Sequence, residues 1–230
     1  MRIKLLPCRL VNPVNRYRLH AATSTVFPGV WACFHLWEQW ALFDGKEAWL
    51  ARMHRTSTGW LVPVEVIFGL IPLGLWTLLH CIAIWRRESI PGQASWEEGK
   101  LAFGLGWLVP LVSPLAIAFV LWHALWLWGM KAQGAALLEL SDAMERTVGL
   151  PWALVIHAFG LFAFSWHLAA ALPDGLEAMG LVKRESKPFV RPFGVALALA
   201  LFVSSAQLIG WIGTGSGTFW PLPVEEVQQN

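Results

Sequence analysis

Five long apolar stretches set the pattern of this chain, with polar connections between them. A helix of about 20 apolar residues is long enough to cross the roughly 30 Å hydrocarbon core of a bilayer. The pattern therefore predicts an all-α integral membrane protein, a five-transmembrane-helix bundle that forms a single membrane domain. The expected spans cover approximately residues 22–43, 60–85, 101–128, 150–172 and 192–213 of the 1–230 domain.

Prolines lie inside three of these stretches, namely Pro28, Pro72, Pro110 and Pro114. A proline removes one backbone hydrogen bond from a helix. Neighbouring helices in a membrane can satisfy the freed backbone groups. We therefore expect kinked helices rather than broken ones.

The composition agrees with a membrane protein and excludes other classes. Apolar residues make up 56% of the chain, and many of its 16 tryptophans lie near the ends of the expected spans, where aromatic belts form. The three cysteines form no CxxC pair, which disfavours a disulfide framework or an iron–sulfur site within the chain. The sequence also has no nucleotide-binding fingerprint and no separate soluble domain.

The distribution of lysine and arginine predicts the orientation of the bundle. The N-terminal arm and the connections after the second and fourth spans together hold twelve basic residues, whereas the opposite side holds five. Cytoplasmic loops of membrane proteins carry the excess of lysine and arginine. The N-terminus is therefore expected in the cytoplasm and the C-terminus outside.

Four of the five stretches carry a histidine near one end: His35, His80, His123 and His167. An ionisable side chain within a membrane is costly and by default marks a function. At 1.5 Å per residue, His35 lies roughly 12 Å and His123 roughly 9 Å from the outer end of its span. His80 and His167 both lie near the cytoplasmic end. The spacing predicts two pairs at two depths, His35 with His123 and His80 with His167.

Two opposed neutral imidazoles from facing helices are what the iron of a b haem needs as axial ligands. The porphyrin would fill apolar space between helices, where bundles commonly hold cofactors. Zinc is disfavoured because no cysteine or carboxylate lies near either pair to complete four ligands. We therefore expect two haem b groups, with these four histidines as the ligands of their irons.

Three further residues leave alternatives open. Glu65 and His157 lie near the outer ends of the second and fourth spans, where a carboxylate and an imidazole suit proton exchange with a quinone. A hydrogen-bonded interfacial pair without a catalytic role explains them equally well. His20, at the cytoplasmic edge, is expected to be a solvated interfacial side chain. The alternative is a hydrogen bond to a bound group just inside that edge.

Four segments in order along residues 16–213 resemble one known family. Arg18-Leu19-His20 with His35 fifteen residues later resembles the start of its first helix, and the segment 65–68 with Pro72 resembles its second. The segment 119–123 (FVLWH) and the segment 160–167, which ends in Trp-His, resemble its third and fourth. This family is the di-haem cytochrome b membrane subunit of succinate:quinone oxidoreductases, the succinate dehydrogenase and fumarate reductase enzymes.

The resemblance implies a function, a set of ligands and a set of partners. His35 and His123 would hold the distal haem, and His80 and His167 the haem proximal to the cytoplasm. The chain would pass electrons between an iron–sulfur subunit and a membrane quinone, with menaquinone favoured over ubiquinone. It would anchor that subunit and a flavoprotein subunit with covalent FAD on the cytoplasmic face, in a bacterial inner membrane. A higher oligomer of the complex is compatible with this reading.

The chain departs from the family at two points. His80 follows Pro72 by eight residues, about one turn later than in relatives, which suggests either a displaced proximal haem or a local irregularity in the second span. The third span also lacks the Gln-Arg pair that some relatives carry. Candidates for the inner haem propionates are therefore Arg18, His20, Arg86 and Arg87.

Two other functions remain open at this point. The first is a di-haem b anchor of another respiratory oxidoreductase, of the nitrate reductase, formate dehydrogenase or hydrogenase type, but one ligand on each of spans one to four favours the succinate family. The second is a haem-free transporter that uses the histidines as a proton relay. A colourless protein without soluble partner subunits would indicate the transporter.

Overall fold

The computed structural model describes residues 12–56, 63, 66–93, 108–132 and 137–214. Within these ranges the chain forms seven α-helices and three short 3-10 or π-helical segments, with no strand. The α-helices are α1 (Pro13–Gln39), α2 (Lys46–Thr56), α4 (Ile71–Arg86), α6 (Val109–Ala132), α7 (Leu137–Val148), α8 (Pro151–Ala178) and α9 (Lys187–Thr214). The short segments are η1 (Trp40–Asp44), η2 (Val66–Leu70) and η4 (Arg184–Ser186).

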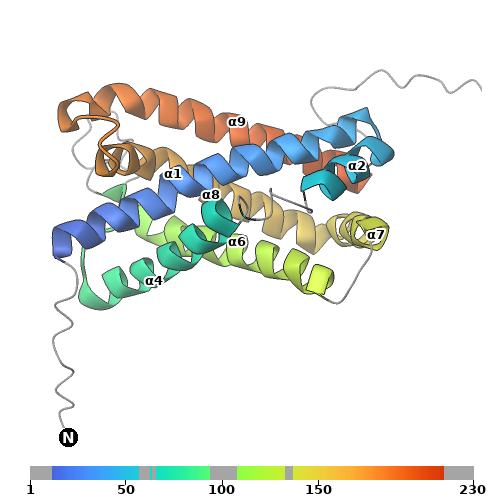
Figure 1. The fold of residues 1–230 in the computed structure, drawn as a ribbon, viewed down its shortest axis with the longest axis horizontal. Coiled ribbons are helices and arrows are strands. Elements are labelled where there is room, and N and C mark those ends of the chain that lie inside the picture. Colours follow the sequence, from blue (N-terminus) through green and yellow to red (C-terminus); the bar gives the residue numbers. More distant parts are fainter. Residues whose placement is uncertain (1–11, 57–62, 64–65, 94–107, 133–136, 215–230) are drawn as a thin grey trace, which may run out of the picture.

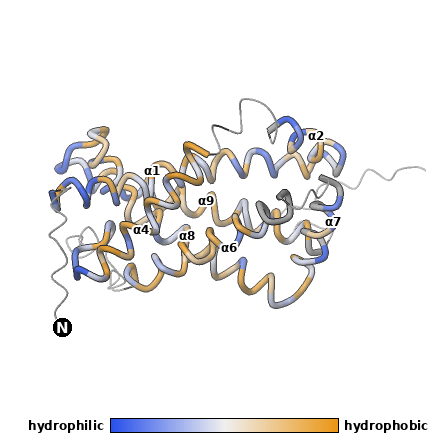
Figure 2. The backbone as a smooth tube through the Cα atoms, turned by 60° about the horizontal axis from the view of Figure 1, so that its bottom comes forward, coloured by the Kyte–Doolittle hydropathy of each residue, from blue (hydrophilic) through white to orange (hydrophobic). Residues whose placement is uncertain are grey.

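The long helices run roughly along one axis, and α8 packs against α1, α6 and α9 (Figure 1). Trp76, Val120, Phe164 and Leu168 belong to the main hydrophobic cluster, which α4, α6, α8 and α9 form together. Hydrophilic residues gather at the two ends of the bundle, and the middle is mostly hydrophobic (Figure 2). This is the hydropathy profile of a bundle that crosses a membrane.

Four described segments are long and apolar enough to cross a membrane: Val66–Arg86, Val109–Trp126, Pro151–Ala178 and Arg184–Ile212. They match the expected second to fifth spans. The expected first span corresponds to most of α1, which is 27 residues long but is not among the four. The described part of the chain is therefore an all-helical, multi-pass membrane bundle with four apolar spans, and the fifth span stays a prediction.

The polar content of α1 has a structural reason. His20, Thr23, Ser24 and Thr25 are all buried against the neighbouring helices, and the three hydroxyls donate hydrogen bonds to backbone carbonyls of their own helix. A helix whose polar side chains face the inside of a bundle has a low mean hydropathy even when its outer face is apolar. Mean hydropathy alone is therefore a poor indicator of whether α1 crosses the membrane.

Helix boundaries differ from the expected ones. The helices α1 and α9 begin nine and five residues before their expected spans, and α8 extends six residues past the end of the fourth. The segments 60–62, 64–65 and 101–107 of the expected second and third spans lie outside the described residues. The expected outer loops contain two helices that the sequence pattern did not predict, α2 and α7, which contact each other at one end of the bundle (Figure 1).

Prolines lie inside helices or in their first turns without ending them, as expected. The helices α1 and α6 continue through Pro28 and Pro114, and Pro72 lies in the first turn of α4. The π-helical segment η2 ends two residues before Pro72, and such turns mark a local irregularity in a helix. This irregularity lies in the expected second span but before Pro72, so it does not account for the spacing between Pro72 and His80, which both lie in α4.

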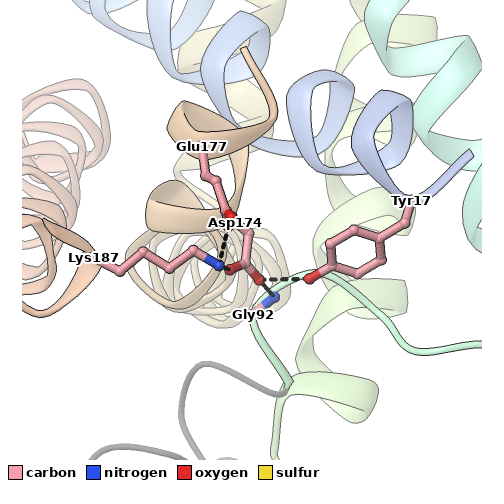
Figure 3. Close-up of polar contacts among 5 residues, drawn as sticks. All are labelled: Tyr17, Gly92, Asp174, Glu177 and Lys187. Carbon is pink, nitrogen blue, oxygen red and sulfur yellow. Dashed lines mark hydrogen bonds and ion pairs between the residues drawn. The ribbon is translucent and has the colours of Figure 1, made fainter. Parts of the chain in front are cut away.

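A buried carboxylate ties the other end of the bundle together (Figure 3). Asp174 is 2% exposed and accepts hydrogen bonds from the Tyr17 hydroxyl at 2.8 Å, the Gly92 amide at 2.7 Å and the Lys187 ammonium at 2.8 Å. Lys187 also pairs with Glu177. These five residues, the Asp174 network, join α1, α8, α9 and the turn that follows α4.

Gly92 lets that turn approach α8 closely. Its φ of +88° lies in the left-handed region, and a Cβ there would be 3.0 Å from the backbone of Ala170 and Ala171. Only glycine combines this conformation with so short an approach. The turn is therefore held by backbone contact as well as by Asp174.

Candidate functional site

The histidines that the sequence singled out gather in two groups of three. His20, His80 and His167, from α1, α4 and α8, form the His80 cluster near the Asp174 network. The second group, from α1, α6 and α8, is the His123 cluster of His35, His123 and His157. Ten residues of α8 separate His157 from His167, so the clusters lie roughly 15 Å apart along that helix.

In the His123 cluster, the ring of His123 faces two others edge-on. Its centroid is 5.9 Å from that of His35 and 5.8 Å from that of His157, with interplanar angles of 78° and 88°. Trp31 stacks on His35 at 5.2 Å, and Phe119 lies against His123 at 5.9 Å. The structure thus brings together the pair that depth predicted, along with His157, which the sequence had placed near the same outer end.

The His123 cluster borders a cavity of about 120 Å³ between α1, α6, α8 and α9. Pockets for larger organic ligands have roughly 300–1,000 Å³. A porphyrin would therefore require this cavity to widen. Trp31 and Phe119 line it and lie against the histidine rings, so these are the side chains whose movement would open it.

In the His80 cluster, the ring centroids of His20 and His80 are 5.5 Å apart at 78°. Trp76 stacks on His167 at 4.8 Å. His20 is 3% exposed, so the expectation of a solvated interfacial side chain is wrong. His20 is buried because the first turns of α1 pack against α4 and α8 instead of standing alone at the membrane edge.

A hydrogen bond with Ser113 favours the tautomer of His167 that carries its proton on Nδ1. The Ser113 hydroxyl donates to the Val109 carbonyl at 2.8 Å, so its oxygen accepts from His167 Nδ1–H at 2.8 Å. The Nε2 atom of His167 then has a free lone pair, and it is buried without a partner. A metal-binding histidine is usually oriented in this way, through a hydrogen bond from its second nitrogen.

Other imidazole nitrogens in the two clusters are also buried without a hydrogen-bond partner. They are His20 Nε2, His80 Nδ1, His80 Nε2 and His123 Nδ1. A buried polar atom without a partner costs about 1–3 kcal/mol, so it calls for an explanation such as a missing ligand. Several unsatisfied imidazole nitrogens in two apolar sites are the chemistry that two metal-centred cofactors would satisfy.

Ring spacing also fits ligation of one iron by two imidazoles. A metal–imidazole bond is about 2 Å long, so two opposed nitrogens are about 4 Å apart and the ring centroids roughly 6 Å apart. His35 and His123 meet this condition at 5.9 Å, as do His123 and His157 at 5.8 Å, so the spacing allows either pair. Among the described residues, no group of three or more histidine, cysteine, aspartate or glutamate side chains is arranged to hold a metal ion alone. Two imidazoles are the donor set that a haem iron needs from a protein, because the porphyrin supplies its other ligands.

The candidates for the propionates differ in position. His20 and Arg87 border a second cavity of about 430 Å³ between the start of α1 and the end of α4. Arg16, on the rim of the same cavity, forms an ion pair with Glu88 at 2.6 Å. Arg18 and Arg86 are exposed and do not border this cavity. Of the four candidates, His20 and Arg87 are thus the two that share a cavity near the His80 cluster.

Two polar residues of the site were missed by sequence reasoning. Glu38 lies one turn after His35, with 3.6 Å between its Oε2 and His35 Nδ1, so the expectation that no carboxylate lies near either histidine pair is wrong. Ser113 lies ten residues before His123 on the same helix, but its hydroxyl forms a hydrogen bond with His167 in the other cluster. The i, i+3 spacing of His35 and Glu38 was a readable signal, but nothing in the sequence connects Ser113 with His167. Glu65 lies outside the described residues, so its expected pairing with His157 is not described either.

Gly160 allows a close approach that shapes the His123 cluster. A Cβ at Gly160 would be 2.2 Å from the ring of Phe119, which packs against both His123 and His157. We expect Gly160→Ala to displace that ring, to cost about 1–3 kcal/mol through overpacking, and to alter the spectrum of a group bound at this cluster. Thermal unfolding in detergent and absorption spectra of the purified protein measure both effects.

The control is Gly74→Ala in α4, where a Cβ meets nothing within 4 Å. This change should leave the melting temperature unchanged or raise it slightly, since alanine restricts the unfolded chain. Equal melting temperatures for the two variants would contradict the packing account of Gly160.

Comparison with known proteins finds no matching family model, no similar curated protein and no similar solved structure.

Proposed function

We propose that this chain is the di-haem cytochrome b membrane subunit of a succinate:quinone oxidoreductase. The observation that carries the proposal is the gathering of histidines from different helices into two apolar clusters, with five of their nitrogens buried and unpartnered. Its function would be to connect an iron–sulfur subunit with a membrane quinone. The sequence resemblance to this family points to the same function, on segments that include His20, His35, His123 and His167.

Four residues would hold the two haem groups. His35 and His123 are the ligands at one site, and His80 and His167 those at the other. When bound, each haem b supplies a one-electron redox centre whose potential depends on its ligands and burial. The protein's part is to present lone pairs at Nε2. Ser113 does this for His167 by fixing its tautomer, and Glu38 is placed to do so for His35.

His20 is the alternative ligand in the His80 cluster, because its ring is 5.5 Å from that of His80. We retain His167 as the ligand because its proton is held at Nδ1 by Ser113, which leaves Nε2 ready for iron. His20 and Arg87 are then available to the propionates through the cavity they share. Arg18 and Arg86 are the weaker candidates for that role.

The proposed arrangement has five spans, with α1 as the first. Its 27 residues extend roughly 40 Å, enough to cross a bilayer. The excess of lysine and arginine places the N-terminus, the Asp174 network and the His80 cluster on the cytoplasmic side. A flavoprotein subunit with FAD and an iron–sulfur subunit would dock there, and menaquinone is the favoured quinone. Glu65 and His157 remain candidates for quinone proton exchange.

The proposal predicts a coloured protein. We expect two b haems per chain in detergent-purified protein, measured by reduced-minus-oxidised spectra and haem quantitation, and co-purification of two soluble subunits from the native membrane. A protein without haem would overturn the proposal in favour of a transporter. Two haems with soluble subunits of the nitrate reductase, formate dehydrogenase or hydrogenase type would instead make it the anchor of that complex.

A further inference from the structure

The third imidazole of the His123 cluster, His157, has no ligand role in the proposed function. It is buried in α8, and its ring stands edge-on to His123 with centroids 5.8 Å apart. Trp122 and Phe119 pack edge-on against it at 5.3 Å and 5.8 Å. Since aromatic rings enclose it on two sides, His157 is held in one place and one orientation.

The position of the proton on His157 follows from its hydrogen bond. Its Nδ1 lies 2.7 Å from the carbonyl oxygen of Ala153, one turn earlier in α8. A carbonyl oxygen can only accept, so Nδ1 must carry the hydrogen. The other nitrogen of the neutral ring, Nε2, is then an acceptor and cannot donate.

His123 has a ring nitrogen that lacks a hydrogen-bond partner. Its Nδ1 is buried without a partner, and the ring borders the cavity. In the proposed function Nε2 of His123 binds the iron, so Nδ1 carries the hydrogen and needs an acceptor of its own. A histidine that binds a metal almost always donates this second N–H to an acceptor, which orients the ring and makes the ligand more basic.

We propose that His157 is a positioning residue for His123, accepting a hydrogen bond from His123 Nδ1–H at its own Nε2. The inference rests on the proposed function. A hydrogen bond of about 2.9 Å between two imidazoles places their centroids about 5 Å apart. The observed centroid distance of 5.8 Å would reach this value if the two rings moved together by less than about 1 Å. This movement is smaller than the widening of the cavity that a porphyrin requires.

A more basic axial imidazole stabilises the ferric state, so loss of the acceptor should raise the reduction potential of this haem. Loss of one such partner typically costs about 10–100-fold in metal affinity or activity, and we take the lower figure for the redox equilibrium. We expect about a tenfold shift of the ferric–ferrous equilibrium toward ferrous, which for a one-electron couple equals about 59 mV. The haem at the His80 cluster should keep its potential.

The test compares His157→Leu, His157→Ala and His157→Gln in the complete complex by redox titration and by electron paramagnetic resonance of the ferric haems. The first two remove the acceptor, and the leucine also fills the space. The glutamine keeps an acceptor oxygen and should restore most of the wild-type potential and spectrum. Phe159→Ala is the matched control, because Phe159 is on the same helix and 71% exposed.

The outcomes separate this inference from the proposed function. Wild-type protein without haem overturns the proposed function. Two haems with unchanged potentials and spectra in His157→Leu and His157→Ala overturn the positioning role alone, including the case where only quinone turnover is lost. Complete loss of one haem in both variants, with His35→Ala retaining two, also overturns it, because His157 would then be the ligand.

Discussion

Alanine in place of His123 is expected to lower the haem content of the purified protein from two b haems per chain to one. Without that imidazole the iron at this cluster would lose one axial ligand. The rings of His35 and His157 each stand edge-on to that of His123, so its loss removes the ring that both of them face. Haem quantitation and difference spectra measure the loss.

The other three ligands provide the internal control. His35→Ala should lose the same haem as His123→Ala, and His80→Ala and His167→Ala should each lose the other one. The double variant His35→Ala with His123→Ala should therefore still contain one haem. If all four single variants lost the same haem, or if His20→Ala rather than His167→Ala removed the inner one, the assignment of pairs would be wrong.

The second large effect is expected at Asp174. Asp174→Ala removes the shared acceptor of the Tyr17 hydroxyl, the Gly92 amide and the Lys187 ammonium in a place with little access to water. Hydrogen bonds to a charged group contribute about 1.5–3 kcal/mol each, and buried groups left unpaired add a desolvation cost. We expect a loss of about 3 kcal/mol or more in stability, seen as a lower melting temperature in detergent.

Two comparisons make this prediction specific. Asp174→Asn keeps one acceptor oxygen and should lose less stability than the alanine variant. Glu177→Ala removes the other partner of Lys187, but its side chain is 30% exposed, and pairs of that kind contribute about 1 kcal/mol at most. A Glu177→Ala loss as large as that of Asp174→Ala would show that the shared acceptor is not what ties this end of the bundle together.

The hydropathy pattern was sufficient to predict the long helices and their order, because four of them are apolar on nearly every side. It was less informative for α1, whose buried Thr23, Ser24 and Thr25 look the same in sequence as solvent-facing residues. It also missed α2 and α7. Their helices depend on packing at the end of the bundle, as Trp49 of α2 shows by being almost fully buried in a cluster with residues of η1 and α9.

The site was predictable to the level of depth and no further. Counting residues from the span ends grouped His35 with His123, because a helix converts sequence position into height. Depth does not say which way a side chain points around its helix axis. Three contacts depend on that rotation and on the neighbouring helix: the burial of His20, the ring contact of His157 with His123 and the hydrogen bond of Ser113 with His167. They follow from the packing of the helices and not from residue positions along the chain.

Three helices each contribute to both clusters, and this limits how the protein can change over evolution. Inserting or deleting one residue between the two sites on such a helix would rotate the residues of one site by about 100° around the helix axis, relative to those of the other, and shift them by about 1.5 Å along it. Length changes should therefore be absent from the central parts of these helices and common in the segments that join them. The residues concerned are His20 and His35 of α1, Ser113 and His123 of α6, and His157 and His167 of α8.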